Sequence, residues 1–245
     1  MKPVPLPMNS IRFSRSLLCA ALLVAGAASA RAQLFVTEVA AWGSGASYAA
    51  DWFELTNTGS SPIDITGWKV DDESESPIGA VALRGVTSIA AGGSVVFLEG
   101  VANGSTDTAL GTAFKSAWFG GSVPSGFTLG FYGGSGVELS STFDAVNIYN
   151  GSKVIQAQVR FATSSAGSPF LTFDNNALID GATLSALSSV GSNGAFASAD
   201  STPTTTYVGS PGFAPVPEPE SYALVTGVAA AAFCAGRRWR RARTA

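Results

Sequence analysis

The stretch DWFELTNTGSSPIDITGWKVDD, residues 51–72, carries the strongest structural signal in the chain. Large apolar residues alternate with polar ones on both sides of residues 57–62, a run of small and polar residues that tolerates a chain reversal. The pattern predicts a half-buried antiparallel pair of strands joined by a turn. After Gly67 the bulky positions change from odd to even numbers, which indicates a bulge and predicts that Trp68 turns into a core.

The remainder of residues 33–213 has the texture of an all-β protein. Short runs rich in Val, Ile, Phe, Thr and Tyr are separated by Gly, Ser and Asn, and no long stretch keeps a helical period. We expect further strands within residues 35–39, 88–98, 127–132, 145–149 and 154–161, with a hairpin turn at Asn150 and Gly151.

These segments together resemble a known family. The strand at 35–39, the stretch at 51–72, the strand after the glycine turn in 88–98 and the Pro-Gly turn in 207–212 resemble the lamin-tail domain. That domain is an immunoglobulin-like β-sandwich found in nuclear lamins and in many exported bacterial proteins. The resemblance implies such a sandwich over residues 33–213. The chain departs from the compact family pattern through long inserts around 106–125 and 163–186.

The first 32 residues have the pattern of a secretory signal peptide. Basic residues precede an apolar run at 17–28, and the small residues Ala30 and Ala32 lie where signal peptidase reads its substrate. We expect cleavage after Ala32. An uncleaved anchor is the alternative, which the apolar run disfavours because it is shorter than the roughly 20 residues needed to span a bilayer.

The chain ends in a motif followed by a short apolar segment and a basic cluster. The motif comprises Val216, Pro217, Glu218 and Pro219, and residues 222–236 form the apolar segment. This composition predicts a short transmembrane helix stopped by charges that stay in the cytoplasm. An ordinary C-terminal anchor is the alternative. The cluster consists of Arg237, Arg238, Arg240, Arg241 and Arg243.

The order of these parts in residues 214–245 resembles the PEP-CTERM sorting signal of Gram-negative bacteria. Members of that family are recognised by exosortase, a membrane protease-transpeptidase, and the signal accompanies production of extracellular polysaccharide. The resemblance therefore implies exosortase as a partner and processing within residues 216–219.

Charge and missing residue types exclude several functions. Between the two terminal signals, five basic residues stand against fifteen acidic ones, a net charge of about −10 that disfavours nucleic-acid binding. The chain has no histidine, and its two cysteines, Cys19 and Cys234, lie in the terminal segments. Residues 33–213 therefore cannot use disulfides, Ser-His-Asp or Cys-His catalysis, or zinc sites with imidazole or thiolate ligands. We expect no cofactor.

Two kinds of site remain for the acidic side chains. Calcium prefers oxygen ligands, which Asp71, Asp72, Glu73 and Glu75 offer. A solvated charge cluster is the commoner explanation for such a run, so we assign no metal there. The second kind is a carboxylate pair for glycoside hydrolysis. Aromatic residues in Gly/Ser-rich stretches would either stack on sugars or fill a core, and these are Trp42, Tyr48, Trp118 and Phe119.

The sequence as a whole predicts a non-catalytic structural or binding protein. It is expected to cross the cytoplasmic membrane, to be anchored there until exosortase processes it, and then to reach the cell surface or the extracellular matrix. Its expected partners are signal peptidase, exosortase, and extracellular polysaccharide or other surface proteins. The alternatives are a matrix polysaccharide hydrolase and a calcium-dependent adhesion module.

Overall fold

The computed structural model describes residues 34–133, 137–165 and 167–214. The expected signal peptide, sorting motif, transmembrane segment and arginine cluster lie outside these residues. Within the described part of the chain, no helix combines the length and the apolar character needed to cross a membrane.

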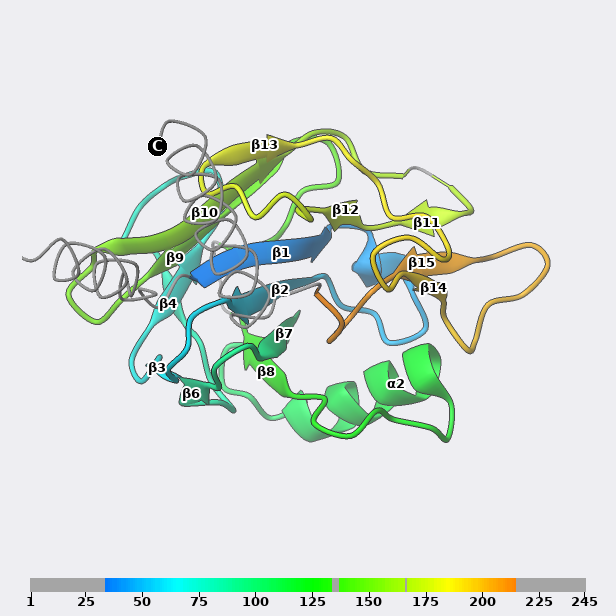
Figure 1. The fold of residues 1–245 in the computed structure, drawn as a ribbon, viewed down its shortest axis with the longest axis horizontal. Helices are drawn as coiled ribbons and strands as arrows, with labels where there is room; N and C mark the ends of the chain where they lie inside the picture. Colours follow the sequence, from blue (N-terminus) through cyan, green and yellow to red (C-terminus); the bar gives the residue numbers. More distant parts are fainter. Residues whose placement is uncertain (1–33, 134–136, 166, 215–245) are drawn as a thin grey trace, which may run out of the picture. The chain divides into compact units, whose positions relative to one another are not determined.

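Two five-stranded sheets form the body of the fold (Figure 1). The first has the order β12-β1-β2-β7-β8, in which only β7 and β8 are parallel. The second has the order β13-β10-β9-β4-β5. The strands of the first are β1 (Leu34–Ala40), β2 (Trp52–Asn57), β7 (Ser94–Glu99), β8 (Leu129–Tyr132) and β12 (Phe173–Asp174). Those of the second are β4 (Lys69–Asp71), β5 (Val81–Ala82), β9 (Asp144–Tyr149), β10 (Ile155–Phe161) and β13 (Ala182–Leu184).

Shorter elements complete the described chain. They are the small sheet of β11 (Phe170–Leu171), β15 (Tyr207–Gly209) and β14 (Phe196–Ala197), the pair β3 (Ile63–Asp64) and β6 (Ser88–Ile89), the 3-10 helix η1 (Gly43–Gly45) and helix α2 (Asp107–Phe119). The described chain is therefore mostly β-sheet with one short α-helix, consistent with an immunoglobulin-like sandwich. The expected strands 35–39, 127–132, 145–149 and 154–161 are confirmed, as is the β9–β10 hairpin.

A core of apolar side chains lies between the two large sheets. Phe53 and Leu55 of β2 enter it from one side, and Val146 and Ile148 of β9 from the other. Each pair follows the two-residue alternation of a strand, so these residues point to the same face of their strand. Trp68 belongs to this core together with Ile65, and Gly67 between them has a φ of 75°, so the predicted inward turn of Trp68 is confirmed.

The hairpin predicted within residues 51–72 is wrong. β2 pairs with β1 and β7, whereas β3 pairs with β6 in a separate small sheet. The reversal itself exists: the Asn57 amide donates to the carbonyls of Ser61, Ile89 and Ala90, and its oxygen accepts the Gly59 N–H. These bonds direct the chain out of the first sheet towards the second, so the turn connects layers instead of neighbouring strands.

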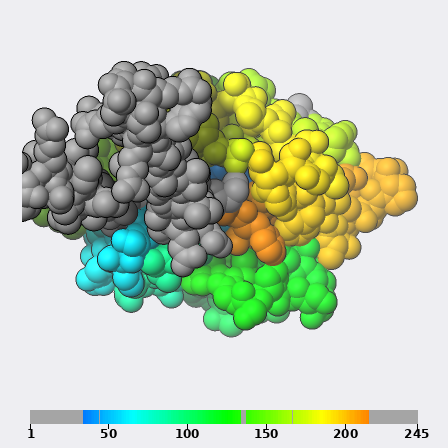
Figure 2. Space-filling model, in the orientation of Figure 1, coloured from blue at the N-terminus to red at the C-terminus, as the bar shows by residue number. Residues whose placement is uncertain are grey.

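The expectation that β2 is half-buried is also wrong, because a second core covers its other face. Trp52 packs there with Phe114 and Trp118 of helix α2 and with Tyr207 of β15. The sequence predicts an insert at 106–125 and no helix there, whereas the structure places helix α2 in it. Its buried residues Gly111, Phe114, Ala117 and Trp118 do follow one helical face, but glycine and threonine interrupt the pattern. Figure 2 shows the last described residues, in orange, beside the green surface of this helix.

Candidate functional site

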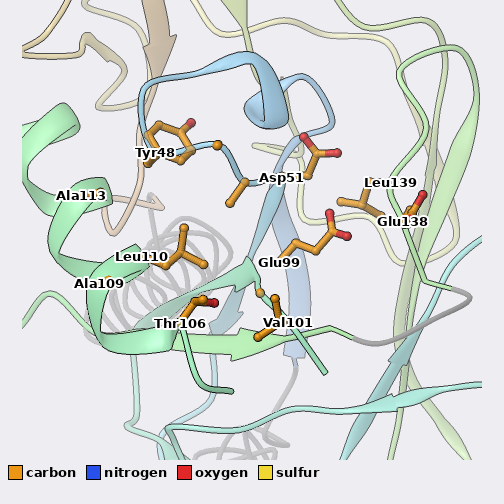
Figure 3. A pocket seen from close by; sticks show the side chains of 13 residues that line it. Tyr48, Asp51, Glu99, Val101, Thr106, Ala109, Leu110, Ala113, Glu138 and Leu139 are labelled. Atoms are coloured by element: carbon orange, nitrogen blue, oxygen red, sulfur yellow. The ribbon is translucent and has the colours of Figure 1, made fainter. Parts of the chain in front are cut away.

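A cleft of about 700 Å³ opens beside the first turns of helix α2 (Figure 3). One wall is apolar and consists of Ala109, Leu110 and Ala113 of the helix. The opposite wall carries three carboxylates, from Asp51 before β2, Glu99 at the end of β7, and Glu138 in the loop before β9. A ligand in this cleft would meet an apolar surface on one side and strong hydrogen-bond acceptors on the other.

Backbone and ion-pair contacts fix the two walls. The Glu99 N–H donates to the Asp51 carbonyl at 2.9 Å, which holds these two residues side by side. On the helix side, the Arg84 guanidinium binds both carboxylate oxygens of Asp107, at 2.7 and 3.0 Å, and also the Val101 carbonyl at 2.8 Å. Such a bidentate pair is geometrically specific. It anchors the first helical turn to the chain that leaves β7.

The acidic wall has unusual proton affinity. Burial, and then the charges of Asp51 and Glu138, raise the pKa of Glu99 from 4.5 to about 7. Beside Glu99 in the sheet register, the buried Tyr132 hydroxyl has no hydrogen-bond partner among the described residues, and its pKa is raised by burial and then by Glu99. A carboxyl that is half-protonated near neutral pH both donates and accepts hydrogen bonds, which suits hydroxylated ligands and proton transfer.

We expect Glu99→Gln to stabilise the fold at pH 8 and to have no effect at pH 4. The folded-state pKa of Glu99 lies above its ordinary value, so the group contributes stability below pH 4.5 that is lost as the pH rises through about 7. The neutral amide avoids this loss, by about 1 to 2 kcal/mol after allowing for solvent screening. Urea unfolding at both pH values checks this. An equal effect at pH 4 and pH 8 would contradict the ionisation argument.

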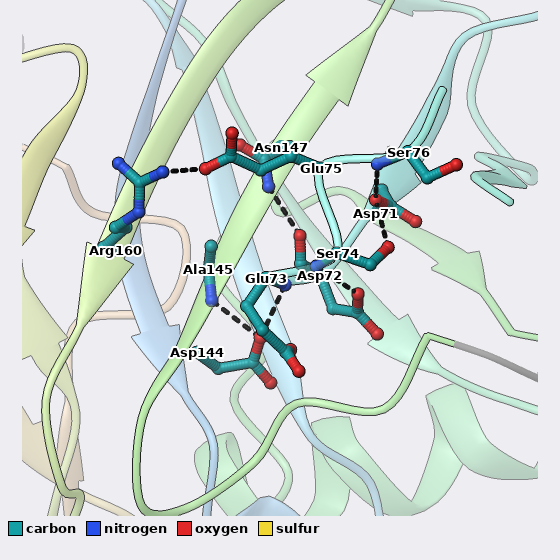
Figure 4. A network of polar contacts seen from close by, with 10 residues as sticks. All are labelled: Asp71, Asp72, Glu73, Ser74, Glu75, Ser76, Asp144, Ala145, Asn147 and Arg160. Carbon is teal, nitrogen blue, oxygen red and sulfur yellow. Dashed lines mark hydrogen bonds and ion pairs between the residues drawn. The ribbon is translucent and has the colours of Figure 1, made fainter. Parts of the chain in front are cut away.

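The four acidic residues proposed as calcium candidates point to different partners (Figure 4). Asp71 is buried, not solvated as the charge-cluster explanation assumed, and it accepts the Ser74 hydroxyl and the Ser76 N–H. Asp72 accepts the Ser74 N–H, and Glu75 pairs with Arg160. The Glu73 N–H donates to Asp144 at 2.9 Å, and a side-chain hydrogen bond with Asp144 lowers the pKa of Glu73.

These carboxylates therefore order the loop that follows β4. Asp144 receives three backbone N–H groups, from Glu73, Ser140 and Ala145, and so ties this loop to the start of β9. Burial and then the Glu73 side chain raise the pKa of Asp144 to about 7. In the described ranges, no group of three or more acidic side chains converges as a metal site would require.

We expect a chelator to leave the melting temperature unchanged, because two apolar cores support the fold and the loop carboxylates already have protein donors. Circular dichroism in EDTA should show β structure and a cooperative melt. A chain that is disordered in EDTA and becomes ordered on adding calcium would restore the calcium alternative.

The aromatic residues proposed for sugar stacking are mostly core side chains. Trp42, Tyr48 and Trp118 are buried in the second core, and only Phe119 is partly exposed. The Trp42 ring stacks on Tyr207 at 5.4 Å, and its Nε1 donates to the Leu171 carbonyl at 2.8 Å. Of the two explanations weighed for these residues, the structure favours core filling for three.

The cleft acids were not singled out in the sequence. Asp51, Glu99 and Glu138 are far apart along the chain and share no motif, so only the folded sheet brings them together. A weak signal exists at Asp51 and Glu99, each of which lies at the end of a strongly apolar strand. The sorting-signal residues 216–219 and 237–243, with Ala30 and Ala32, lie outside the described residues and stay predictions.

Comparison with known proteins identifies the family of the chain. The family description "Lamin Tail Domain" matches residues 27–163, more than half of the chain, beginning within the predicted leader. The match spans β1 to β10, whereas β11 to β15 follow it. No curated protein matches the chain. The chain belongs to the lamin tail domain family.

Proposed function

We propose that this chain is an exported bacterial surface or matrix protein in which the lamin tail sandwich acts as a non-catalytic binding module. The observation that carries the proposal is the order of parts. A lamin tail domain, typically a non-catalytic immunoglobulin-like fold, lies between a leader-like sequence and a sorting-type sequence. That arrangement suits a domain presented outside the cell.

Export and processing complete the proposal. Signal peptidase removes residues 1–32, and the arginines of residues 237–243 hold the apolar segment in the cytoplasmic membrane. Exosortase then cuts within residues 216–219. Two contacts near the end of the described fold support this position. The Gly212 N–H donates to Glu54 at 2.5 Å, and the Phe213 ring contacts Phe196 at 5.9 Å between ring centres, so a cut within residues 216–219 comes after both contacts.

The cleft is the proposed binding site for matrix polysaccharide, with other surface proteins as further partners. Its carboxylates accept hydrogen bonds from sugar hydroxyls, and Leu110 and Ala113 offer an apolar surface to a sugar ring. The net charge of about −10 between the terminal signals repels polyanions, so the proposal favours neutral or amine-bearing sugars.

The test is incubation of the protein with the extracellular polysaccharide of a host that makes it. Retention of the polysaccharide on immobilised protein, without shortening, supports a binding module. Asp51→Asn with Glu138→Gln should weaken retention, whereas Ile78→Ala, at a side chain that is 82 % exposed on the loop after β4, should not. Absence of retention by the wild type would contradict the binding role.

A polysaccharide hydrolase is the second candidate, which one observation favours. Glu99, with a pKa of about 7, lies in the same cleft as Asp51, and glycoside hydrolysis uses one protonated and one ionised carboxyl group. Shortening of the polysaccharide that Glu99→Gln abolishes would establish this activity. Retention without shortening would leave the binding role.

A further inference from the structure

Two buried glutamates lie side by side under the C-terminal segment, away from the cleft carboxylates. Glu38 of β1 and Glu54 of β2 are partners in the strand register, and their side chains are 1 % and 0 % exposed. Asp174 of β12 is the register partner of Glu38 on its other side, so three carboxylates form a row across three strands. Among described residues, the ion pairs lie elsewhere, between Arg84 and Asp107 and between Arg160 and Glu75.

The two glutamates bind the segment that ends the described fold. The Ser210 N–H donates to Glu38 Oε1 at 2.7 Å, and the Ser210 hydroxyl to Oε2 at 3.1 Å. The Gly212 N–H donates to Glu54 Oε2 at 2.5 Å. The approach is close: a Cβ at Gly209 would lie 2.7 Å from Glu38 Oε1, so this position requires glycine. Residues 210–213 are therefore fastened to the sheet through two carboxyl groups, whereas Tyr207–Gly209 are already held in β15 by pairing with β11 and β14.

Neighbouring hydroxyl groups let both carboxyl groups carry a proton without losing these bonds. Thr37 Oγ1 lies 2.7 Å from Glu54 Oε1, and a hydroxyl can accept a hydrogen bond as well as donate one. A proton on Glu54 Oε1 can thus be donated to Thr37, and a proton on Glu38 Oε2 to the Ser210 hydroxyl. The backbone N–H groups of Ser210 and Gly212 keep their acceptors in either case.

Ionisation of both glutamates would destabilise the docked segment. Two adjacent negative charges would then lie in a buried site, with Asp174 as the third carboxylate of the row. Like charges directly opposite each other on neighbouring strands destabilise the pairing, and buried charges without a cation are costly. Opening of the segment would let water reach both carboxylates.

We propose that Glu38 and Glu54 form a proton-dependent clasp, which holds residues 210–213 on the sheet while it is protonated and releases them when both groups ionise. The clasp is a property of the folded module and does not depend on the proposed function.

The direction of the pH dependence follows from the pKa values of the two glutamates in the docked state, in which the segment lies on the sheet. Burial and then the Glu54 charge raise the pKa of Glu38 from 4.5 to about 8, and burial raises the pKa of Glu54 to about 7, with a smaller contribution from Asp174. The hydrogen bonds from Ser210 and Gly212 lower these two pKa values, but by less than burial raises them. Groups with raised pKa values stabilise the docked state below pH 4.5 and lose this contribution as the pH rises through about 8. Docking should therefore be tight at pH 6 and weak above pH 9.

Hydrogen–deuterium exchange of the full-length chain in mild detergent tests the clasp. Protection is measured for residues 210–213 and for β7 at pH 6 and pH 9.5, after correction for the intrinsic exchange rate. We expect protection of 210–213 to fall at least about tenfold at the higher pH, the factor that one unit of pKa difference provides. Protection of β7 should change much less, which separates release of the segment from global unfolding.

Variants test whether the pH effect on exchange comes from Glu38 and Glu54. Glu38→Gln and Glu54→Gln mimic the protonated groups, so each should retain protection of 210–213 at pH 9.5 better than the wild type. Gly209→Ala should lower protection at both pH values, and the cleft variant Glu99→Gln should release the segment as the wild type does. Unchanged wild-type protection at pH 9.5, or equal losses in the glutamine variants and the wild type, would overturn the proposal.

Discussion

Replacing Trp52 with alanine is expected to lower the free energy of unfolding by about 3 to 5 kcal/mol, the range for a large buried aromatic side chain. Trp52 is 0 % exposed, and its side chain lies between the sheet and helix α2. Its ring makes edge-on contacts with Phe114 and Trp118, both at 5.8 Å, and its Nε1 donates to the Tyr48 hydroxyl at 3.1 Å. The substitution removes these contacts and leaves a cavity in the second core.

Chemical denaturation of the wild type and the variant measures this effect, with Ile78→Ala as the control. The Ile78 side chain is 82 % exposed, so its removal should change stability by no more than about 0.5 kcal/mol. If the two substitutions had equal effects, helix α2 would not pack on β2 as the structure shows.

Replacing Pro217, Glu218 and Pro219 together with alanine is expected to leave export intact and to abolish processing. The two prolines fix an extended backbone with few hydrogen-bond donors, which a protease can accept as a strand-like substrate. The apolar segment 222–236 and the arginines that follow act earlier, by stopping translocation. In a host with exosortase, the variant should therefore accumulate uncut in the membrane fraction.

Deletion of residues 237–243 is the matched comparison, because it should weaken membrane retention before processing instead of blocking the cut. Cell fractionation with immunoblotting distinguishes the two effects. A shortened form of the triple variant outside the membrane fraction would make residues 217–219 an ordinary linker.

Strand positions were predictable from the sequence because they depend on local alternation. Phe53 and Leu55 mark the core face of β2 by their spacing, and the parity change at Gly67 places Trp68 in the same core. Asn150 and Gly151 correctly predict a hairpin, in which the Asn150 side chain accepts the Ser152 and Val154 N–H groups while Lys153 has the positive φ, 62°. In each case the information lies within a few residues.

Pairing partners and layers were not predictable in the same way. The run 57–62 predicts a reversal, but only the long-range bonds from the Asn57 side chain to Ile89 and Ala90 show that the chain changes sheets there. Burial of Glu54 depends on a segment more than 150 residues later, whose Gly212 N–H reaches its carboxylate. The cleft is equally non-local, since Asp51, Glu99 and Glu138 meet only in the folded sheet.

The mass of the protein released from an exosortase-containing host decides between export with processing and the alternatives. We expect a species that begins at Gln33 and ends within residues 216–219, recovered outside the cytoplasmic membrane and folded as a β-sandwich. A released protein that retains the apolar segment 222–236 and the terminal arginines, or a protein found only in the cytoplasm, would contradict it.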